Sequence, residues 1–93
     1  EYVLSDLKTD ENIKEWLNIG LEEFLQNNDL NAFIKALEYA VRAKDSISGI
    51  SQKTGISRSS LYAVFKGEQQ PQLVTVMKIM KELGYMLKTA LLP

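Results

Sequence analysis

The side chains best suited to chemistry in this sequence are an arginine and three serines at residues 57–60. The guanidinium of Arg58 can donate two hydrogen bonds to the N7 and O6 atoms of a guanine, or contact a phosphate. The hydroxyls of Ser57, Ser59 and Ser60 fall where a helix is expected to begin, and there they can hold a phosphate together with free backbone N–H groups. Ser57 can also be a simple helix N-cap. The stretch predicts a surface that contacts nucleic acid.

Four further residues extend this predicted surface. Tyr62 can offer its hydroxyl to a phosphate and its ring to a thymine methyl, or it can pack against the preceding turn. Ala63 can add only an apolar contact. Lys66 and Lys53 are predicted phosphate neighbours, with solvated surface lysines as the alternative interpretation. The full predicted DNA-binding set is Ser57, Arg58, Ser59, Ser60, Tyr62, Ala63, Lys66 and Lys53.

Two short helices must position these residues. Ser46 is a predicted N-cap, and Ile47, Ile50 and Ser51 follow it at the i, i+3, i+4 spacing of one inward helix face. Gly55 falls where this helix must stop and where the backbone needs a positive φ, which glycine adopts without steric cost.

The second short helix repeats the pattern. After the predicted cap at Ser57, the inward positions are Leu61, Val64 and Phe65, and Gly67 ends the helix. Residues 46–67 therefore predict a helix-turn-helix, in which the second helix is the one that enters a major groove.

Two amphipathic helices are predicted before this core. The first is expected from about Asp10 to Gln26, capped by Thr9 or Asp10, and the second from a cap at Asp29 to Lys44. Their apolar stripes are Ile13, Trp16, Leu17, Leu21, Phe24 and Leu25, then Leu30, Phe33, Ile34, Leu37, Ala40 and Val41.

A fifth helix is predicted after Pro71 and is ended by Gly84, with an apolar stripe of Leu73, Val76, Met77, Met80 and Leu83. The large apolar positions Trp16, Phe24, Phe33, Phe65, Met77 and Met80 are all predicted to lie in the core. The sequence thus predicts one all-α, five-helix domain over residues 1–93, with acidic helices at 10–44.

Residues 85–93 change in character, since only Lys88 is charged among apolar residues. They are predicted to be a short C-terminal strand used in dimerisation, pairing with residues 2–4 or with a second copy of the chain. A continued helix and a frayed tail are the alternatives.

The composition excludes several classes of function. The chain has no cysteine and no histidine, which removes disulfides, thiol chemistry, Ser-His-Asp triads and the common zinc sites. The adjacent acids Asp10-Glu11 and Glu22-Glu23 diverge on a helix, so paired-carboxylate catalysis is not expected. We expect no enzyme activity, no cofactor and no metal. No apolar run approaches the roughly 18–20 residues of a membrane span, which predicts a cytoplasmic protein without a membrane partner.

The net charge of −1 conceals an asymmetry. Residues 1–34 carry eight acids and two bases, whereas residues 35–93 carry nine bases and four acids. The basic part contains the predicted helix-turn-helix, and binding depends on where charge lies rather than on its sum. The acidic part is available to a different, basic partner, although solvated helix faces would explain it equally well.

The chain also resembles known families. Residues 46–84 look like the lambda-repressor-like (Xre-type) helix-turn-helix, and nearly the whole chain is similar to addiction-module antidotes, the HigA-like antitoxins. This resemblance rests on residues 10–13, Trp16-Leu17, residues 21–23, Phe33, Ala36-Leu37, residues 41–43, residues 55–58, Leu61-Tyr62, Pro71, Thr75-Val76, Lys78-Ile79 and Leu83-Gly84.

The resemblance implies an antitoxin that binds and neutralises a cognate toxin, typically a small RelE-like ribonuclease. It also implies repression of the protein's own operon, as a homodimer bound to double-stranded operator DNA.

The sequence departs from the family pattern at Ile47, Gly49, Ala63 and Gln70, and two of these departures bear on the choice of function. Ile47 stands where a polar residue is common, and Ala63 stands where a basic residue is common. These departures favour an alternative in which the helix-turn-helix is only the scaffold of a protein-interaction module. A phage-type repressor without a toxin partner is a third hypothesis.

Overall fold

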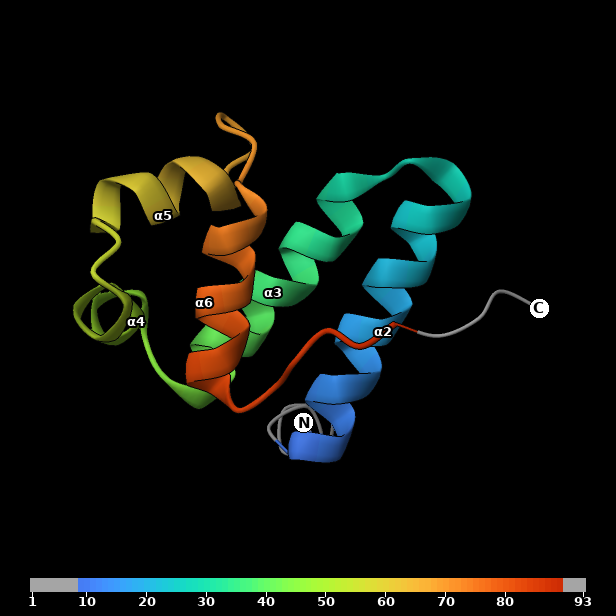
Figure 1. Ribbon diagram of the computed structural model, residues 1–93, viewed down its shortest axis with the longest axis horizontal. Coiled ribbons are helices and arrows are strands. Elements are labelled where there is room, and N and C mark those ends of the chain that lie inside the picture. The colour runs from blue at the N-terminus through green and yellow to red at the C-terminus, as the bar shows by residue number, and fades with distance from the viewer. Residues whose placement is uncertain (1–8, 90–93) are drawn as a thin grey trace, which may run out of the picture.

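A computed structural model describes residues 9–89 and contains five helices in that part of the chain (Figure 1). They are α2 (Asp10–Asn27), α3 (Leu30–Lys44), α4 (Ile47–Thr54), α5 (Arg58–Phe65) and α6 (Leu73–Leu83). Residues 9–89 include no strand, so the predicted all-α fold with five helices is confirmed.

The first two helices begin and end where the sequence predicts. The Thr9 side chain accepts a hydrogen bond from the Asn12 backbone N–H at 3.2 Å, and Asp29 accepts one from the Ala32 N–H at 3.3 Å. Asn28 ends α2 in the left-handed conformation, with φ of 56°. Asparagine tolerates this region better than most residues, so the two-residue connection turns the chain back tightly.

Helices α2 and α3 pack side by side as a hairpin, and a glycine sets how closely they approach (Figure 1). A Cβ atom added at Gly20 would lie 2.9 Å from the Cα of Phe33 and 3.1 Å from the carbonyl oxygen of Ala32. Since real Cβ atoms do not come that close to backbone, Gly20 permits an approach that any larger residue would prevent.

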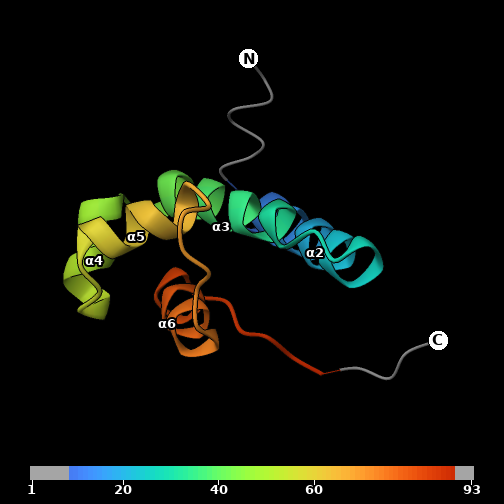
Figure 2. The same cartoon turned by 90° about the horizontal axis from the view of Figure 1, so that it is seen from above.

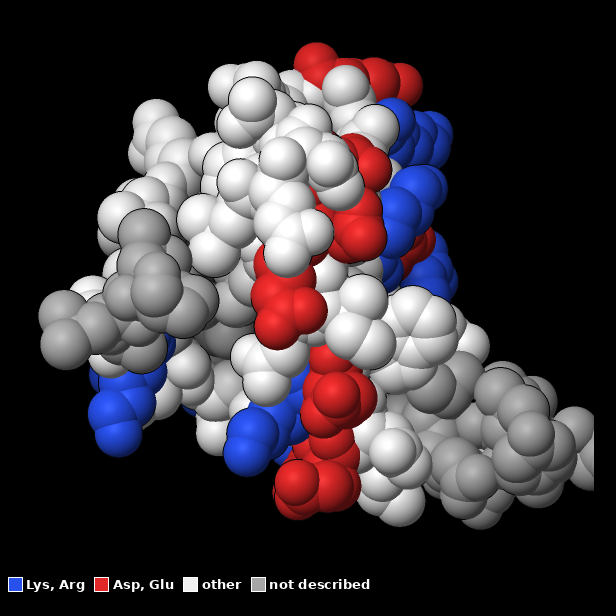
Figure 3. Space-filling model, turned by 90° about the vertical axis from the view of Figure 1, so that its right-hand side faces the viewer, with Lys and Arg blue, Asp and Glu red and all other residues white. Residues whose placement is uncertain are grey.

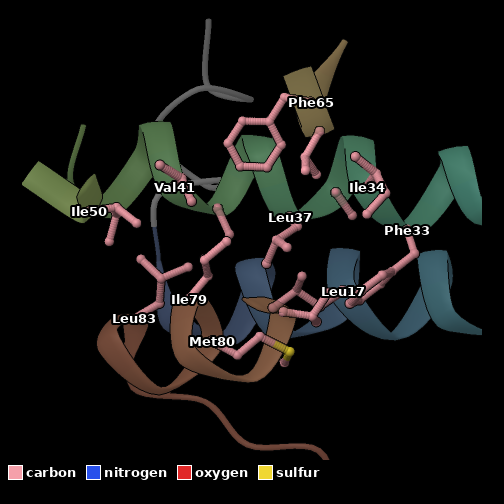
Figure 4. Close-up of a cluster of buried hydrophobic side chains, with 14 of the residues drawn as sticks. Leu17, Phe33, Ile34, Leu37, Val41, Ile50, Phe65, Ile79, Met80 and Leu83 are labelled. Atoms are coloured by element: carbon pink, nitrogen blue, oxygen red, sulfur yellow. The ribbon is translucent and has the colours of Figure 1, made fainter. Parts of the chain in front are cut away.

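Helix α3 is the centre of the domain and packs against α2, α4, α5 and α6. Its residues Leu37 and Val41 are fully buried, and they meet Ile50 of α4, Leu61 of α5 and Ile79 of α6 in one cluster. Figure 4 shows these helices contributing side chains to a single core. The core of this domain is therefore organised around α3, with α4 and α5 held on it from one end.

Three of the six large residues predicted to be core are exposed instead. Trp16 is 41% exposed, Phe24 37% and Met77 46%, whereas Phe33, Phe65 and Met80 are buried as predicted. Trp16 and Phe24 are exposed because α2 packs mainly against α3, which covers only a narrow stripe of α2.

The buried face of α6 is also displaced from the predicted one. The observed inward positions are Val76, Ile79, Met80 and Leu83. Leu73, predicted to begin the stripe, is exposed, and Ile79, which was not predicted, is fully buried. This helix is apolar on two neighbouring faces, so its periodicity fits both, and only packing against α3 and α4 selects one.

The segment after α6 does not form the predicted strand within the described residues, because residues 85–89 have no regular secondary structure. Tyr85 and Leu87 instead pack against the core. Figure 2 shows the chain after α6 continuing without a helix or a strand. The remaining parts of the strand prediction, residues 90–93 and the pairing segment 2–4, lie outside the described residues. No described helix is long and apolar enough to cross a membrane.

Candidate nucleic-acid interface

Helices α4 and α5 form the predicted pair of short helices joined by a tight turn. Ser46 caps α4 by accepting a hydrogen bond from the Gly49 N–H at 2.9 Å. Gly55 ends α4 with φ of 79°, in the left-handed region. Three residues, 55–57, then separate the two helices, so the direction of the chain changes over a very short distance.

The side chain of Thr54 braces this turn, a role that the sequence analysis missed. Its Oγ1 donates a hydrogen bond to the carbonyl of Ile50 at 2.7 Å and accepts one from the N–H of Ile56 at 3.2 Å. The same hydroxyl thus joins the last turn of α4 to the residue beyond Gly55. It fixes the angle at which α5 leaves α4.

The serines at the start of α5 have two different environments. Ser57 is the N-cap, accepting from the Ser60 N–H at 3.1 Å, and its hydroxyl donates to the Ser60 Oγ at 2.9 Å. Ser60 is consequently half-buried, whereas Ser59 is exposed. Ser57 therefore has the predicted capping role. The Ser59 hydroxyl is exposed to solvent and makes no hydrogen bond to any residue in 9–89.

The exposed face of α5 carries most of the predicted set in one row. Ser59, Tyr62 and Lys66 are spaced three and four residues apart, which places them on the same side of a helix. Tyr62 is 43% exposed, and Arg58 lies one turn before it at the N-terminal end of the helix. The opposite face is buried through Leu61, Val64 and Phe65, as predicted.

Arg58 is held by a residue that the sequence analysis did not identify. Its Nη1 donates a hydrogen bond across to the Oγ of Ser48 on α4, at 3.3 Å. Within the described part of the chain, one of the five N–H donors of the guanidinium is used in this way, and the others have no partner there. No local sequence signal links these residues, because they lie on different helices ten positions apart.

Lys53 differs from the other predicted cations, because an acid already engages it. Its Nζ lies 2.7 Å from Oδ2 of Asp45, the residue before the α4 cap. The hydrogen bond from Lys53, with a second one from the Ser46 N–H, holds the pKa of Asp45 below its ordinary value. The bond with Asp45 in turn raises the pKa of Lys53. The positive charge at Lys53 is therefore partly compensated within the protein.

Two of the departures from the family pattern, Ile47 and Ala63, have different environments. Ile47 is only 4% exposed and belongs to the core, so its apolar side chain is explained by packing. Ala63 is half-buried, and its carbonyl accepts hydrogen bonds from the N–H groups of Glu68 and Gln69, at 2.9 Å and 3.3 Å. These bonds involve the Ala63 backbone and close the end of α5, while the methyl group stays partly exposed.

A second surface lies on α6, away from α5. An apolar groove of about 780 Å³ runs between α6 and the segment that follows it. The exposed residues Leu73, Val74 and Met77 line one side, and Met86 and Leu87 line the other. Large exposed apolar surfaces of this kind are typical of interaction sites. No group of three or more acidic side chains in residues 9–89 is arranged to bind a metal ion.

These elements define a small, all-α domain in which two short helices present a polar, cationic surface. A family model described as "Probable addiction module antidote protein" matches residues 2–91, nearly the whole chain, and the chain therefore belongs to this family. Comparisons with curated proteins and with solved structures found no match. As a member of an antidote family, the protein has an antitoxin role in an addiction module, with a toxin as its partner, and it is not an enzyme.

Proposed function

We propose that this antitoxin binds operator DNA in a sequence-specific manner and represses its own operon as a dimer. In the same proposal it neutralises a RelE-like ribonuclease by direct binding, as part of a type II toxin–antitoxin module in the cytoplasm. The lambda-repressor-like assignment of residues 46–84 is part of this proposal. The observation that carries it is the row of Arg58, Ser59, Tyr62 and Lys66 along the exposed face of α5.

The geometry of that row supports major-groove binding. Helix α5 has eight residues, its inner face is buried, and its outer face has no bulky apolar residue other than the Tyr62 ring. Arg58, steadied by Ser48, stands at the N-terminal end, where recognition helices contact base edges. Lys66 and Ser59 are suited to phosphates, while the internal ion pair of Lys53 makes it the weakest member of the set.

The apolar groove on α6 supports the dimer. One short helix reaches only one half-site, and repressors of this type commonly place two such helices about 34–36 Å apart. Homodimer interfaces are the most apolar class of interface, and the groove is lined mainly by Leu73, Val74, Met77 and Met86. A second copy of the chain is the occupant that we assign to it.

The structure weakens the argument for a pure interaction module. That alternative rested on Ile47 and Ala63, and Ile47 belongs to the buried core of the helix pair rather than to its outer surface. The family match favours an antitoxin over a toxin-free phage repressor.

The test is a fluorescence anisotropy titration of a labelled duplex from the region upstream of the gene, at several salt concentrations. The wild type should bind with a steep salt dependence and prefer this duplex to a scrambled one. Arg58→Ala should weaken binding by about 1–3 kcal/mol and relax the sequence preference. Arg42→Ala is the matched control, because Arg42 is the other arginine of the chain and pairs with Glu38 on α3.

An equal loss of DNA affinity in both arginine variants would show that DNA binding depends only on the net charge of the protein. Equal binding to the scrambled duplex by the folded wild type would overturn the repressor proposal.

A further inference from the structure

Helix α2 has an exposed surface that neither the core nor the helix pair uses. Four of its large apolar residues are exposed: Trp16, Ile19, Phe24 and Leu25. Trp16 and Ile19 lie one turn apart on the same side of α2, and exposed apolar patches of neighbouring residues mark interaction sites. Helix α2 lies at the opposite end of the molecule from α4 and α5 in both ribbon views (Figures 1 and 2).

The centre of this surface consists of two aromatic rings in contact. The ring of Trp16 stacks at a tilt against that of Tyr39 on α3, with 5.8 Å between the ring centroids and 43° between the planes. Both rings are nonetheless about two-fifths exposed. Ile19 is 46% exposed and lies one helical turn beyond Trp16, on the same side of α2. Aromatic residues held in place by a neighbour are the usual anchors of protein interfaces.

Carboxylates surround this apolar centre. Glu15 and Glu23 are each four residues from Ile19, so one lies on either side of it along the helix. Glu11 and Glu22 continue the row on the outer face of α2, and Figure 3 shows acidic side chains forming a column along that face. Among residues 9–89, the ion pair that α2 makes involves Asp10, and Glu23 accepts a hydrogen bond from the Asn27 side chain at 2.9 Å, so Glu11, Glu15 and Glu22 remain available.

The helix dipole favours only the first of these four glutamates, Glu11. Glu11 and Glu15 are spaced i, i+4, at which like charges destabilise a helix. Only the first turn of α2 gains from acids through the helix dipole, and Glu15, Glu22 and Glu23 lie beyond it. A positively charged partner would turn this repulsion into attraction, and it would not compete with DNA for α5.

We propose that the α2 surface, consisting of Trp16, Ile19 and Tyr39 with Glu11, Glu15, Glu22 and Glu23, is where the toxin docks. This inference rests on the proposed function, which makes the partner a ribonuclease, and it adds the surface and its chemistry. A ribonuclease binds RNA through a basic face. The matching partner surface is such a basic face, with an apolar recess that receives Ile19 and the Trp16 ring. Because α2 and α5 are at opposite ends, the toxin-bound antitoxin retains its operator binding.

The experiment is a calorimetric titration of the full-length chain with the toxin protein encoded beside it in the same operon. Two independent variants test the surface: Ile19→Arg for the apolar centre and Glu15→Lys/Glu22→Lys for the carboxylates. Each should weaken toxin binding about tenfold or more, which corresponds to about 1.4 kcal/mol. The charge variant should also reduce the salt dependence of association.

The matched control is Glu68→Lys/Glu82→Lys, which changes the net charge equally but lies on the loop after α5 and on α6. It should bind the toxin as the wild type does. Both α2 variants should keep wild-type operator affinity and thermal stability. Such a result would show that the loss of toxin binding comes from the α2 surface and not from a damaged fold.

The outcomes distinguish the two proposals. Toxin binding by both α2 variants at wild-type strength would overturn the α2 surface and leave the antitoxin function intact. Equal weakening in the control would overturn the surface in favour of net charge alone. Failure of the folded wild type to bind the co-encoded toxin would overturn the toxin half of the proposed function, and the surface with it. Loss of operator binding in the toxin complex would overturn the independence of the two ends.

Discussion

The Nζ of Lys44 lies 2.7 Å from Oδ1 of Asp10, and the same ammonium donates a hydrogen bond to the backbone carbonyl of Leu83, also at 2.7 Å. The ring of Tyr85 covers the ammonium with its centroid 4.8 Å away, and the Tyr85 hydroxyl donates to Asp10. One lysine thus joins the first turn of α2, the last turn of α3 and the end of α6. It also secures the segment that borders the α6 groove.

Lys44→Met should lower the free energy of unfolding by about 1 kcal/mol. The aliphatic stem is kept, but an ion pair in a partly exposed place and a hydrogen bond to a helix-terminal carbonyl are lost. Urea denaturation followed by circular dichroism measures the change. Lys35→Met, at an exposed position of α3 without an ion pair in residues 9–89, should be nearly neutral. Identical midpoints for the two variants would contradict the role assigned to Lys44.

Acid should weaken the fold through Asp10 and Asp45. The hydrogen bond from Lys44 and its charge hold the pKa of Asp10 below the ordinary value, and Lys53 does the same for Asp45. A carboxyl with a depressed pKa in the folded state stabilises the fold above its unfolded pKa of about 3.9, and this contribution is lost as the pH falls through the folded pKa. The urea midpoint should therefore fall between about pH 5 and pH 2.

The double variant Asp10→Asn/Asp45→Asn should lose less stability than the wild type over that interval. Glu15→Gln/Glu22→Gln removes two carboxyls that make no ion pair in the described structure, and it is the matched control. If the urea midpoint of the aspartate variant falls with pH as steeply as that of the wild type, these ion pairs do not govern the loss of stability in acid.

Gly20→Ala tests the close approach of α2 and α3. Helix propensity alone predicts that alanine would stabilise α2 by about 0.5–1 kcal/mol. The added Cβ would lie 2.9 Å from the Cα of Phe33, however, and backbone cannot move aside as a side chain can. We expect a net destabilisation of about 1–3 kcal/mol in thermal or urea unfolding. The control is Asn18→Ala, at an exposed site on the same helix, which measures the effect of helix propensity alone. A Gly20→Ala variant more stable than the wild type would contradict the close approach of α2 and α3.

Ser48→Ala should weaken the sequence preference of DNA binding with little change in stability. The hydroxyl of Ser48 orients Arg58, so its effect should depend on the presence of that arginine. A double-mutant cycle of Ser48→Ala with Arg58→Ala, measured by anisotropy on matched and mismatched duplexes, should be non-additive. Strictly additive effects would mean that Ser48 acts on DNA by itself or not at all.

Met77→Asp should convert the proposed dimer to a monomer, because a carboxylate in the apolar groove of α6 would lie buried against the second copy. Sedimentation equilibrium over a range of concentrations measures this change. Leu25→Asp, an exposed leucine on α2 replaced in the same way, should leave the assembly unchanged. A wild type that is monomeric throughout would remove the dimer from the proposed function.

Much of the local structure was predictable because it is encoded by neighbours in sequence. The caps at Thr9, Asp29, Ser46 and Ser57 each bond to a backbone N–H three residues ahead, a distance at which a short side chain decides the outcome by itself. Gly55 and Gly84 end their helices with positive φ for the same local reason. The polar outer face of α5 also followed from its spacing, since Leu61, Val64 and Phe65 fix which side is inward.

The relationships between distant residues depended on the tertiary structure. The exposure of Trp16 and Met77 could not be predicted, because an amphipathic stripe shows that a helix is covered and not how widely. The same holds for the contacts of Lys44 with Leu83 and of Arg58 with Ser48, which join different helices. A periodic pattern indicates which side of a helix is apolar on average. Which residues touch each other depends on how the helices cross. The sequence by itself determined the helices, their ends and the polar face of α5, and only the packing around α3 decided which apolar side chains stayed exposed for partners.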